Sequence, residues 1–207
     1  MPGVTRELRG LVPVEVAALL AAAFVALPVP SSVPLLVVAS LSLYLRRTSW
    51  ADRMRGPGLH AAIGAVAGLV ALGVAIAIGT PLVEGLTDQA VNWSMYPVVR
   101  GSGTTAVTVA IVVGVGALAS ELVLRGWIVE RVLELGRGHA VLAILVGAFA
   151  EALLAGGTLE ARIGAGVFGI GLGAMYVAGG RSVVAPICAR LVFALGALVL
   201  EATRVVG

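Results

Sequence analysis

The sequence of 207 residues contains no lysine, one cysteine and two histidines, and only 12% of its residues are charged. Soluble domains average about 25% charged residues, so an ordinary soluble domain is excluded. The single cysteine, Cys188, has no second cysteine in the chain with which to form a disulfide. No group of Cys and His residues has metal-ligand spacing, and we therefore expect no metal and no cofactor.

Apolar residues dominate the chain: 59% of the residues are hydrophobic, and the mean hydropathy is +1.07. They occur in long runs, which are typical of transmembrane helices. We predict an all-α, polytopic integral membrane helix bundle, with residues 1–207 forming a single membrane domain in contact with the lipid bilayer. The net charge of +3 does not indicate nucleic-acid binding, because the arginines flank the apolar runs, where they orient a membrane protein. No nucleic-acid partner is expected.

The apolar runs predict about seven membrane spans, of which the second is short for a full crossing. Their approximate ranges are 11–27, 34–45, 60–80, a run beginning near 104, 139–156, 162–179 and 183–200. Residues 81–103 are more polar and are expected to connect two spans outside the membrane. Glycine recurs with bulky residues between 164 and 173, a pattern that favours a closely packed helix face over a nucleotide-binding loop.

The distribution of arginine predicts the orientation. Alternating spans place the arginines near residues 6–9, 46–55, 131–137 and 181 on one side of the membrane. Because basic loops remain in the cytoplasm, we predict a cytoplasmic N-terminus. The absence of lysine and the abundance of Ala, Gly and Val favour a GC-rich bacterial genome, so we expect a multi-pass protein of the bacterial inner membrane.

Four ionisable residues lie within the apolar runs: Glu121, Arg125, Glu151 and Arg190. Charges inside a membrane are costly, so each is a candidate site residue. Glu121 and Arg125 are four residues apart on one helix face and can pair. Arg190 cannot be deprotonated and needs a carboxylate or several carbonyl groups as partners, and of the carboxylates Glu151 is favoured over Glu121. The charged residues after Arg125 alternate with apolar ones, which predicts an amphipathic helix at the bilayer surface.

Three stretches resemble motifs of the CPBP family, the intramembrane proteases related to the CAAX-processing enzyme Rce1 and to bacteriocin self-immunity proteins. "SELVLRGW" from Ser120 is similar to the family's Glu-Glu-x-x-x-Arg motif. "AFAEALL" from Ala148 resembles its Phe-x-x-x-His motif, and "GLGAMYVAGGRSVVAPICARLVFAL" from Gly171 resembles its run ending in His-x-x-x-Asn. The resemblance implies a CPBP-like core over residues 104–200.

The family's catalytic positions are substituted in this chain. The resemblance implies that the first glutamate acts as general base, while two histidines and an asparagine bind and polarise the scissile carbonyl. Those four positions are occupied here by Ser120, Leu153, Arg190 and Ala194. Glu121, Arg125, Gly126, Phe149 and Pro186 are retained, and Glu151 is a spare carboxylate.

The substitutions predict that the chain has lost proteolysis and serves as a scaffold or accessory subunit that binds other transmembrane proteins along its glycine-rich faces. The alternative is an active glutamic-type intramembrane endopeptidase, of the CAAX or leader-peptide-processing kind, with a rearranged site built on Glu151. Ser120 as a nucleophile would need a partner base. A transporter is the weakest alternative, because no inverted repeat is apparent. A cavity joining Ser120, Glu151 and Arg190 with room for a peptide would favour the protease.

Overall fold

A computed structural model describes residues 12, 14–16, 18, 32–88, 91, 96–100, 102–155 and 158–203, and across these residues the chain forms helices and no strands. The predicted all-α fold is confirmed for them. The principal helices are α3 (Ser32–Leu45), α4 (Pro57–Val74), α5 (Thr80–Thr87), α6 (Gly103–Glu121), α7 (Glu130–Leu135), α8 (Ala140–Leu154), α9 (Leu159–Ala178) and α10 (Val184–Ala202). Two 3₁₀ turns, Trp50–Arg53 and Pro97–Val99, and two π-helical segments, Ala75–Gly79 and Leu122–Val129, connect or extend them.

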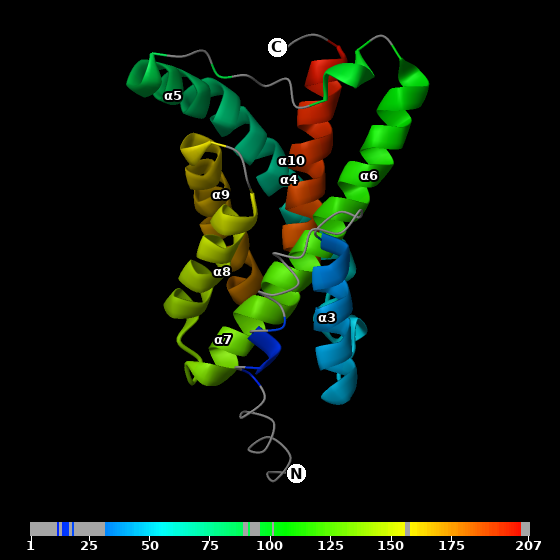
Figure 1. Ribbon diagram of the computed structural model, residues 1–207, viewed down its shortest axis with the longest axis vertical. Helices are drawn as coiled ribbons and strands as arrows, with labels where there is room; N and C mark the ends of the chain where they lie inside the picture. The colour runs from blue at the N-terminus through cyan, green and yellow to red at the C-terminus, as the bar shows by residue number, and fades with distance from the viewer. Residues whose placement is uncertain are drawn as a thin grey trace.

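Four helices in the described part of the chain are long and apolar enough to cross a membrane: Pro57–Leu86, Gly103–Leu135, Leu159–Ala178 and Val184–Ala202. The shorter apolar helices Pro34–Leu45 and Ala140–Leu154 correspond to the predicted second and fifth spans. The predicted first span, 11–27, lies mostly outside the described residues, so the number of seven stays a prediction. The 33-residue helix Gly103–Leu135 is about 50 Å long and runs diagonally across the bundle (Figure 1).

The arginines gather at one end of the bundle. Successive helices run in alternating directions, and Figure 1 shows α7 at one end of the bundle and the C-terminal end of α10 at the other. Contacts join loops that are distant in sequence at the end that contains α7: Arg53 and Arg181 both pair with Glu130, and Arg46 pairs with Glu134. The prediction that the arginines of these loops share one side is therefore confirmed for Arg46, Arg53 and Arg181, whereas Arg6 and Arg9 lie outside the described residues. Which side of the membrane this is stays a prediction.

Glycine residues on α4 allow α10 to pack closely against it. A Cβ atom at Gly64 would lie 2.2 Å from the carbonyl oxygen of Ala185, and one at Gly68 would lie 2.4 Å from that of Ala189. Only glycine permits two helix backbones to approach so closely. The predicted close packing of the glycine run on α9 is confirmed for two of its glycines: Gly169 contacts Ala148 and Glu151 of α8, and Gly173 contacts Ile144.

The segment after Arg125 does not form the predicted surface helix. Leu122–Val129 and α7 continue α6 into the interior, and Trp127, Glu130 and Arg131 are all buried. Trp127 packs with α3, and the loop after α3 covers Glu130 through Arg53. The alternation of charged and apolar residues therefore marks a helix whose charged side faces other charged groups of the protein. The prediction of an amphipathic helix lying at the bilayer surface was wrong.

Candidate functional site

The four intramembrane charges meet in one cluster. Arg125, which is fully buried, donates from Nη2 to Glu151 Oε2 at 2.5 Å and to the carbonyl oxygen of Gly169 at 2.9 Å. Its Nη1 lies 3.3 Å from Glu121 Oε1. The i, i+4 pair predicted between Glu121 and Arg125 is confirmed, and Arg125 also binds Glu151, the predicted partner of Arg190.

Arg190 completes the cluster from α10. Its Nε donates to Glu121 Oε1 and its Nη2 donates to Glu151 Oε1. The guanidinium also lies over the ring of Phe168, 5.6 Å from the centroid. The predicted pairing of Arg190 with Glu151 is confirmed, and Glu121 is a second partner.

The cluster is balanced in charge, with two carboxylates and two guanidiniums. Both oxygens of Glu151 accept charge-assisted hydrogen bonds, and Glu121 Oε1 is shared between the two arginines. Glu121 Oε2 and Arg125 Nε are buried and have no hydrogen-bond partner among the described residues. Each carboxylate pairs with both guanidiniums, so a water that it could deprotonate would have to compete with two charged donors.

Two glycines make room for the cluster. A Cβ at Gly169 would lie 2.7 Å from Glu151 Oε2, so a side chain there would displace the carboxylate from Arg125. Gly126, next to Arg125, lies under Trp50, whose ring would be 3.0 Å from a Cβ. Packing therefore explains why an arginine is followed by a glycine here. The Arg125 side chain is buried, and Trp50 of the loop after α3 leaves no room for a side chain at Gly126. Arg125 lies in the π-helical segment, a backbone form frequently found at functional sites.

The other motif-equivalent positions lie apart from the cluster. Leu153 is 51% exposed and Phe149 is 65% exposed on the outer side of α8, whereas Glu151 on the same helix is buried. Ala194 lies half-buried one turn beyond Arg190 on α10. The structure therefore brings Ser120, Glu121, Arg125, Glu151 and Arg190 together and leaves Leu153 outside.

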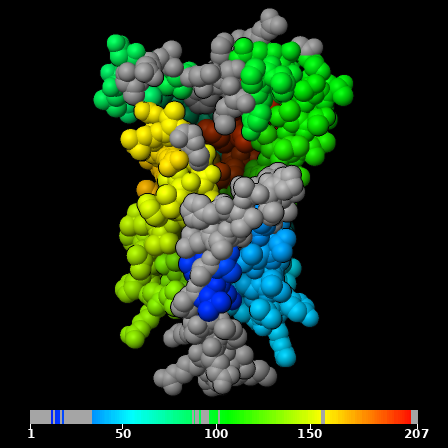
Figure 2. Space-filling model, viewed as in Figure 1, coloured from blue at the N-terminus to red at the C-terminus, as the bar shows by residue number. Residues whose placement is uncertain are grey.

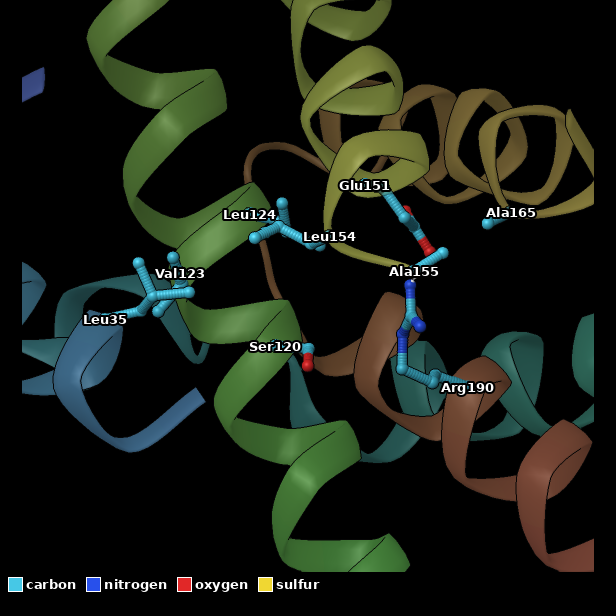
Figure 3. A pocket seen from close by; sticks show the side chains of 9 residues that line it. All are labelled: Leu35, Ser120, Val123, Leu124, Glu151, Leu154, Ala155, Ala165 and Arg190. Atoms are coloured by element: carbon cyan, nitrogen blue, oxygen red, sulfur yellow. Dashed lines mark hydrogen bonds and ion pairs between the residues drawn. The ribbon is translucent and has the colours of Figure 1, made fainter. Parts of the chain in front are cut away.

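A cavity of about 140 Å³ lies beside the cluster and is lined by Ser120, Glu151 and Arg190 (Figure 3). Its other lining residues are apolar: Leu35, Val123, Leu124, Leu154, Ala155 and Ala165. A cavity of about 150 Å³ accommodates a molecule the size of benzene. The cavity that would favour a protease, one that joins Ser120, Glu151 and Arg190, is therefore present. Its volume, however, is far too small for an extended peptide.

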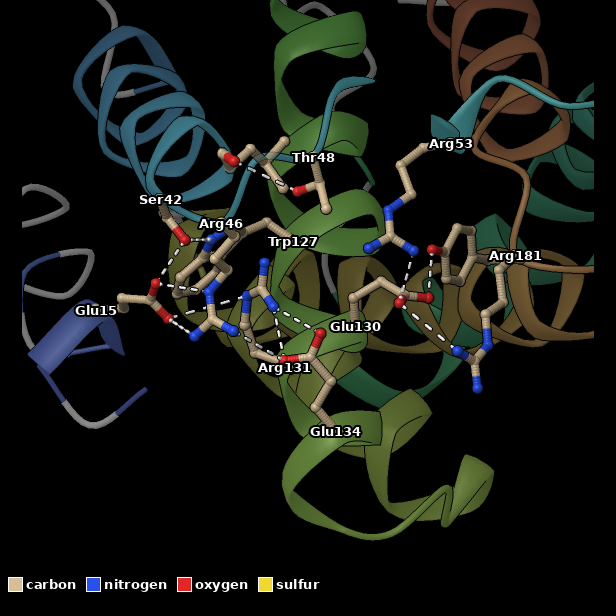
Figure 4. Close-up of polar contacts among 12 residues, drawn as sticks. Glu15, Ser42, Arg46, Thr48, Arg53, Trp127, Glu130, Arg131, Glu134 and Arg181 are labelled. Atoms are coloured by element: carbon tan, nitrogen blue, oxygen red, sulfur yellow. Dashed lines mark hydrogen bonds and ion pairs between the residues drawn. The ribbon is translucent and has the colours of Figure 1, made fainter. Parts of the chain in front are cut away.

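Sequence reasoning missed a second buried network at the arginine-rich end (Figure 4). Glu130 is 2% exposed, accepts a 2.7 Å hydrogen bond from the Tyr176 hydroxyl and pairs with Arg53 at 2.7 Å. Arg181 approaches the same carboxylate at 3.8 Å. Glu130 therefore fastens the loop after α3 and the turn after α9 to the central helix. Its partners are non-local in sequence, so no local signal could have revealed its burial.

We expect Glu130→Gln to loosen this end of the bundle. The amide keeps the hydrogen bond from Tyr176 but leaves Arg53 without its anion, at a cost of about 2 to 4 kcal/mol. Limited trypsin digestion of the detergent-solubilised protein should cut faster at the exposed Arg55. Glu134→Gln is the matched control, because Glu134 is 36% exposed and should lose about 1 kcal/mol or less. Equal digestion rates for the two variants would contradict this assignment.

The helical spans and the buried charge cluster define a polytopic membrane protein with an ionic core. A family model described as type II CAAX prenyl endopeptidase Rce1-like matches residues 102–196, slightly less than half of the chain. This region therefore resembles the Rce1-like domain of the CPBP family of membrane proteins. The match extends from the start of α6 into α10 and contains all four charges of the cluster. Comparison with curated proteins and with solved structures finds no match.

Proposed function

We propose that this Rce1-like protein no longer cleaves peptides and acts as a scaffold or accessory subunit of a membrane protein complex. The observation that carries the proposal is the double engagement of both buried carboxylates by Arg125 and Arg190. A general base must be able to accept a proton from a bound water. Glu121 and Glu151 are instead committed to two permanently charged guanidiniums.

Histidine does not supply the missing base. His60 lies in the first turn of α4, where its Nδ1 is 2.7 Å from the carbonyl oxygen of Arg55. His139 is exposed at the start of α8. Both residues belong to the arginine-rich end of the bundle, whereas Arg190 occupies the motif position of the family's second histidine. One member of the cluster, Arg190, therefore pairs with Glu121 and Glu151 at a position where the family has a catalytic side chain.

The outer side of α9 offers a surface for another transmembrane helix. Gly164 and Gly171 are exposed, and a Cβ at either would meet nothing within 4 Å. They are seven residues apart, so they lie on the same helix face, next to the exposed Ile163, Val167 and Ile170. Small residues on a lipid-facing helix let a partner helix approach closely. We place the partner contact here.

We expect the double replacement Gly164→Leu and Gly171→Leu to abolish complex formation while leaving the fold intact. The protein would be extracted from its native membrane in a mild detergent, and its complexes would be sized and identified by native electrophoresis and mass spectrometry. Gly73→Leu is the control, because Gly73 is equally open but lies on α4. A wild-type protein that is only ever monomeric, or a complex unaffected by the double replacement, would contradict the proposal.

One observation favours the alternative, an endopeptidase with a rearranged site. Ser120, Glu151 and Arg190 line the same cavity, so water in it could reach a carboxylate and a hydroxyl. For Glu151 to act as the base, Arg125 and Arg190 would both have to release it when substrate binds. The small volume and the neutral balance of the cluster make this the second candidate.

A further inference from the structure

We propose that the cavity beside the charge cluster is a binding site for the ester carbonyl of a bilayer glycerolipid and the first methylenes of its acyl chain. The inference rests on the proposed function in one respect: a cavity that no longer receives peptide is available to a lipid. The proposal is independent of whether a partner protein binds α9.

The polar wall of the cavity carries unused hydrogen-bond donors. Arg190 uses Nε and Nη2 for its two carboxylates, and no contact from the described residues engages its Nη1. Its side chain is 20% exposed, whereas those of Glu121 and Glu151 are 0% and 5% exposed. Ser120 contributes a hydroxyl without a hydrogen-bond partner among the described residues, and it projects from α6 toward the same space (Figure 3). Both residues line the cavity, so each offers it a hydrogen-bond donor.

The charge balance decides which acceptor fits. Glu121 and Glu151 already neutralise Arg125 and Arg190, so a phosphate or a carboxylate would introduce an uncompensated charge into a buried site. A neutral carbonyl oxygen accepts hydrogen bonds from Arg190 and Ser120 without that penalty. The site therefore selects an ester or amide group rather than an anionic headgroup.

The rest of the cavity fits an aliphatic segment. Six of the nine lining residues are apolar, and this apolar wall favours contact with hydrocarbon over contact with water. A volume of about 140 Å³ suits a carbonyl group with a few methylenes, not a whole lipid. The remainder of the molecule needs a path outward, and Figure 2 shows a hollow between α9 and α6 with α10, the helix that carries Arg190, at its floor.

The test uses the full-length protein in nanodiscs of zwitterionic phosphatidylcholine. The nanodiscs also contain a photoactivatable phosphatidylcholine that carries a diazirine next to the acyl ester. After irradiation, mass spectrometry should locate the label on peptides bearing Leu124, Leu154 or Ala165. Excess unlabelled ester lipid should compete, and the ether-linked analogue, which lacks the carbonyl, should compete at least ten-fold less well.

Ala165→Leu should fill the cavity and remove the label, whereas Ala174→Leu, at an exposed position on the same helix, should retain it. Label that is unaffected by Ala165→Leu, or equal competition by ester and ether lipids, would overturn the proposal. If Ala165→Leu fails to fold, the competition between ester and ether lipids in the wild-type protein tests the lipid site by itself. Peptide cleavage and complex formation are separate readouts, so a failed proposal of function would not be mistaken for a failed lipid site.

Discussion

Replacing Arg190 with methionine should destabilise the protein by about 3 to 5 kcal/mol, the range found when one partner of a buried ion pair is removed. The variant leaves Glu121 and Glu151 with a single guanidinium, that of Arg125, and so buries an uncompensated negative charge. Unfolding of the purified protein by a denaturing detergent, followed through the fluorescence of the buried Trp127, measures the loss.

A second replacement should reverse much of this loss. Adding Glu151→Gln to Arg190→Met restores neutrality, because one carboxylate and one guanidinium then remain. We expect a coupling free energy of about 1 to 3 kcal/mol between the two sites in a double-mutant cycle. Arg162→Met, at an exposed position in the first turn of α9, should change stability by about 0.5 kcal/mol or less. A double variant less stable than Arg190→Met alone would show that charge balance does not hold the cluster together.

Gly64→Ala and Gly68→Ala should separate α4 from α10. Alanine has the higher helix propensity by about 1 kcal/mol, but the added methyl groups would lie 2.2 and 2.4 Å from backbone oxygens of α10. Backbone cannot rotate away as a side chain can, so the steric term prevails. We expect each variant to lose about 1 to 3 kcal/mol and the double variant to unfold at much lower detergent concentration.

Gly73→Ala on the same helix isolates the steric effect. A Cβ there meets nothing within 4 Å, so only helix propensity acts and the variant should be unchanged or slightly more stable. The same unfolding assay compares all three positions. Similar stabilities for Gly64→Ala and Gly73→Ala would mean that α4 and α10 are not in the close contact described above.

The sequence predicts the helical class and the members of the charge cluster, because charges within apolar runs need partners. Glu121, Arg125, Glu151 and Arg190 were all identifiable in this way, and the spacing of Glu121 and Arg125 fixed their shared face. The sequence could not show that Arg125 reaches across to Glu151 and Gly169, since that contact depends on how α8 and α9 pack.

For a similar reason, the sequence could not show which residues of α8 face the interior or that α7 is buried. Matching Phe149 to the family motif assigns Leu153 to the histidine position, yet the inward side of α8 carries Ala148 and Glu151. A helix in lipid has apolar residues on all sides, so its inward face is poorly marked. Likewise, the sequence places Glu130 on a helix at the bilayer surface because its main partner, Arg53, is distant in the sequence.

Cleavage of a membrane-embedded peptide by the purified protein tests the central claim, which is that the charge cluster leaves no group able to activate water. The assay would use lipid vesicles, a quenched-fluorescent transmembrane peptide and mass spectrometry of the products. We expect no cleavage above that in protein-free vesicles. Peptide turnover that disappears in Glu151→Gln, with the fold retained as judged by unfolding, would contradict the account.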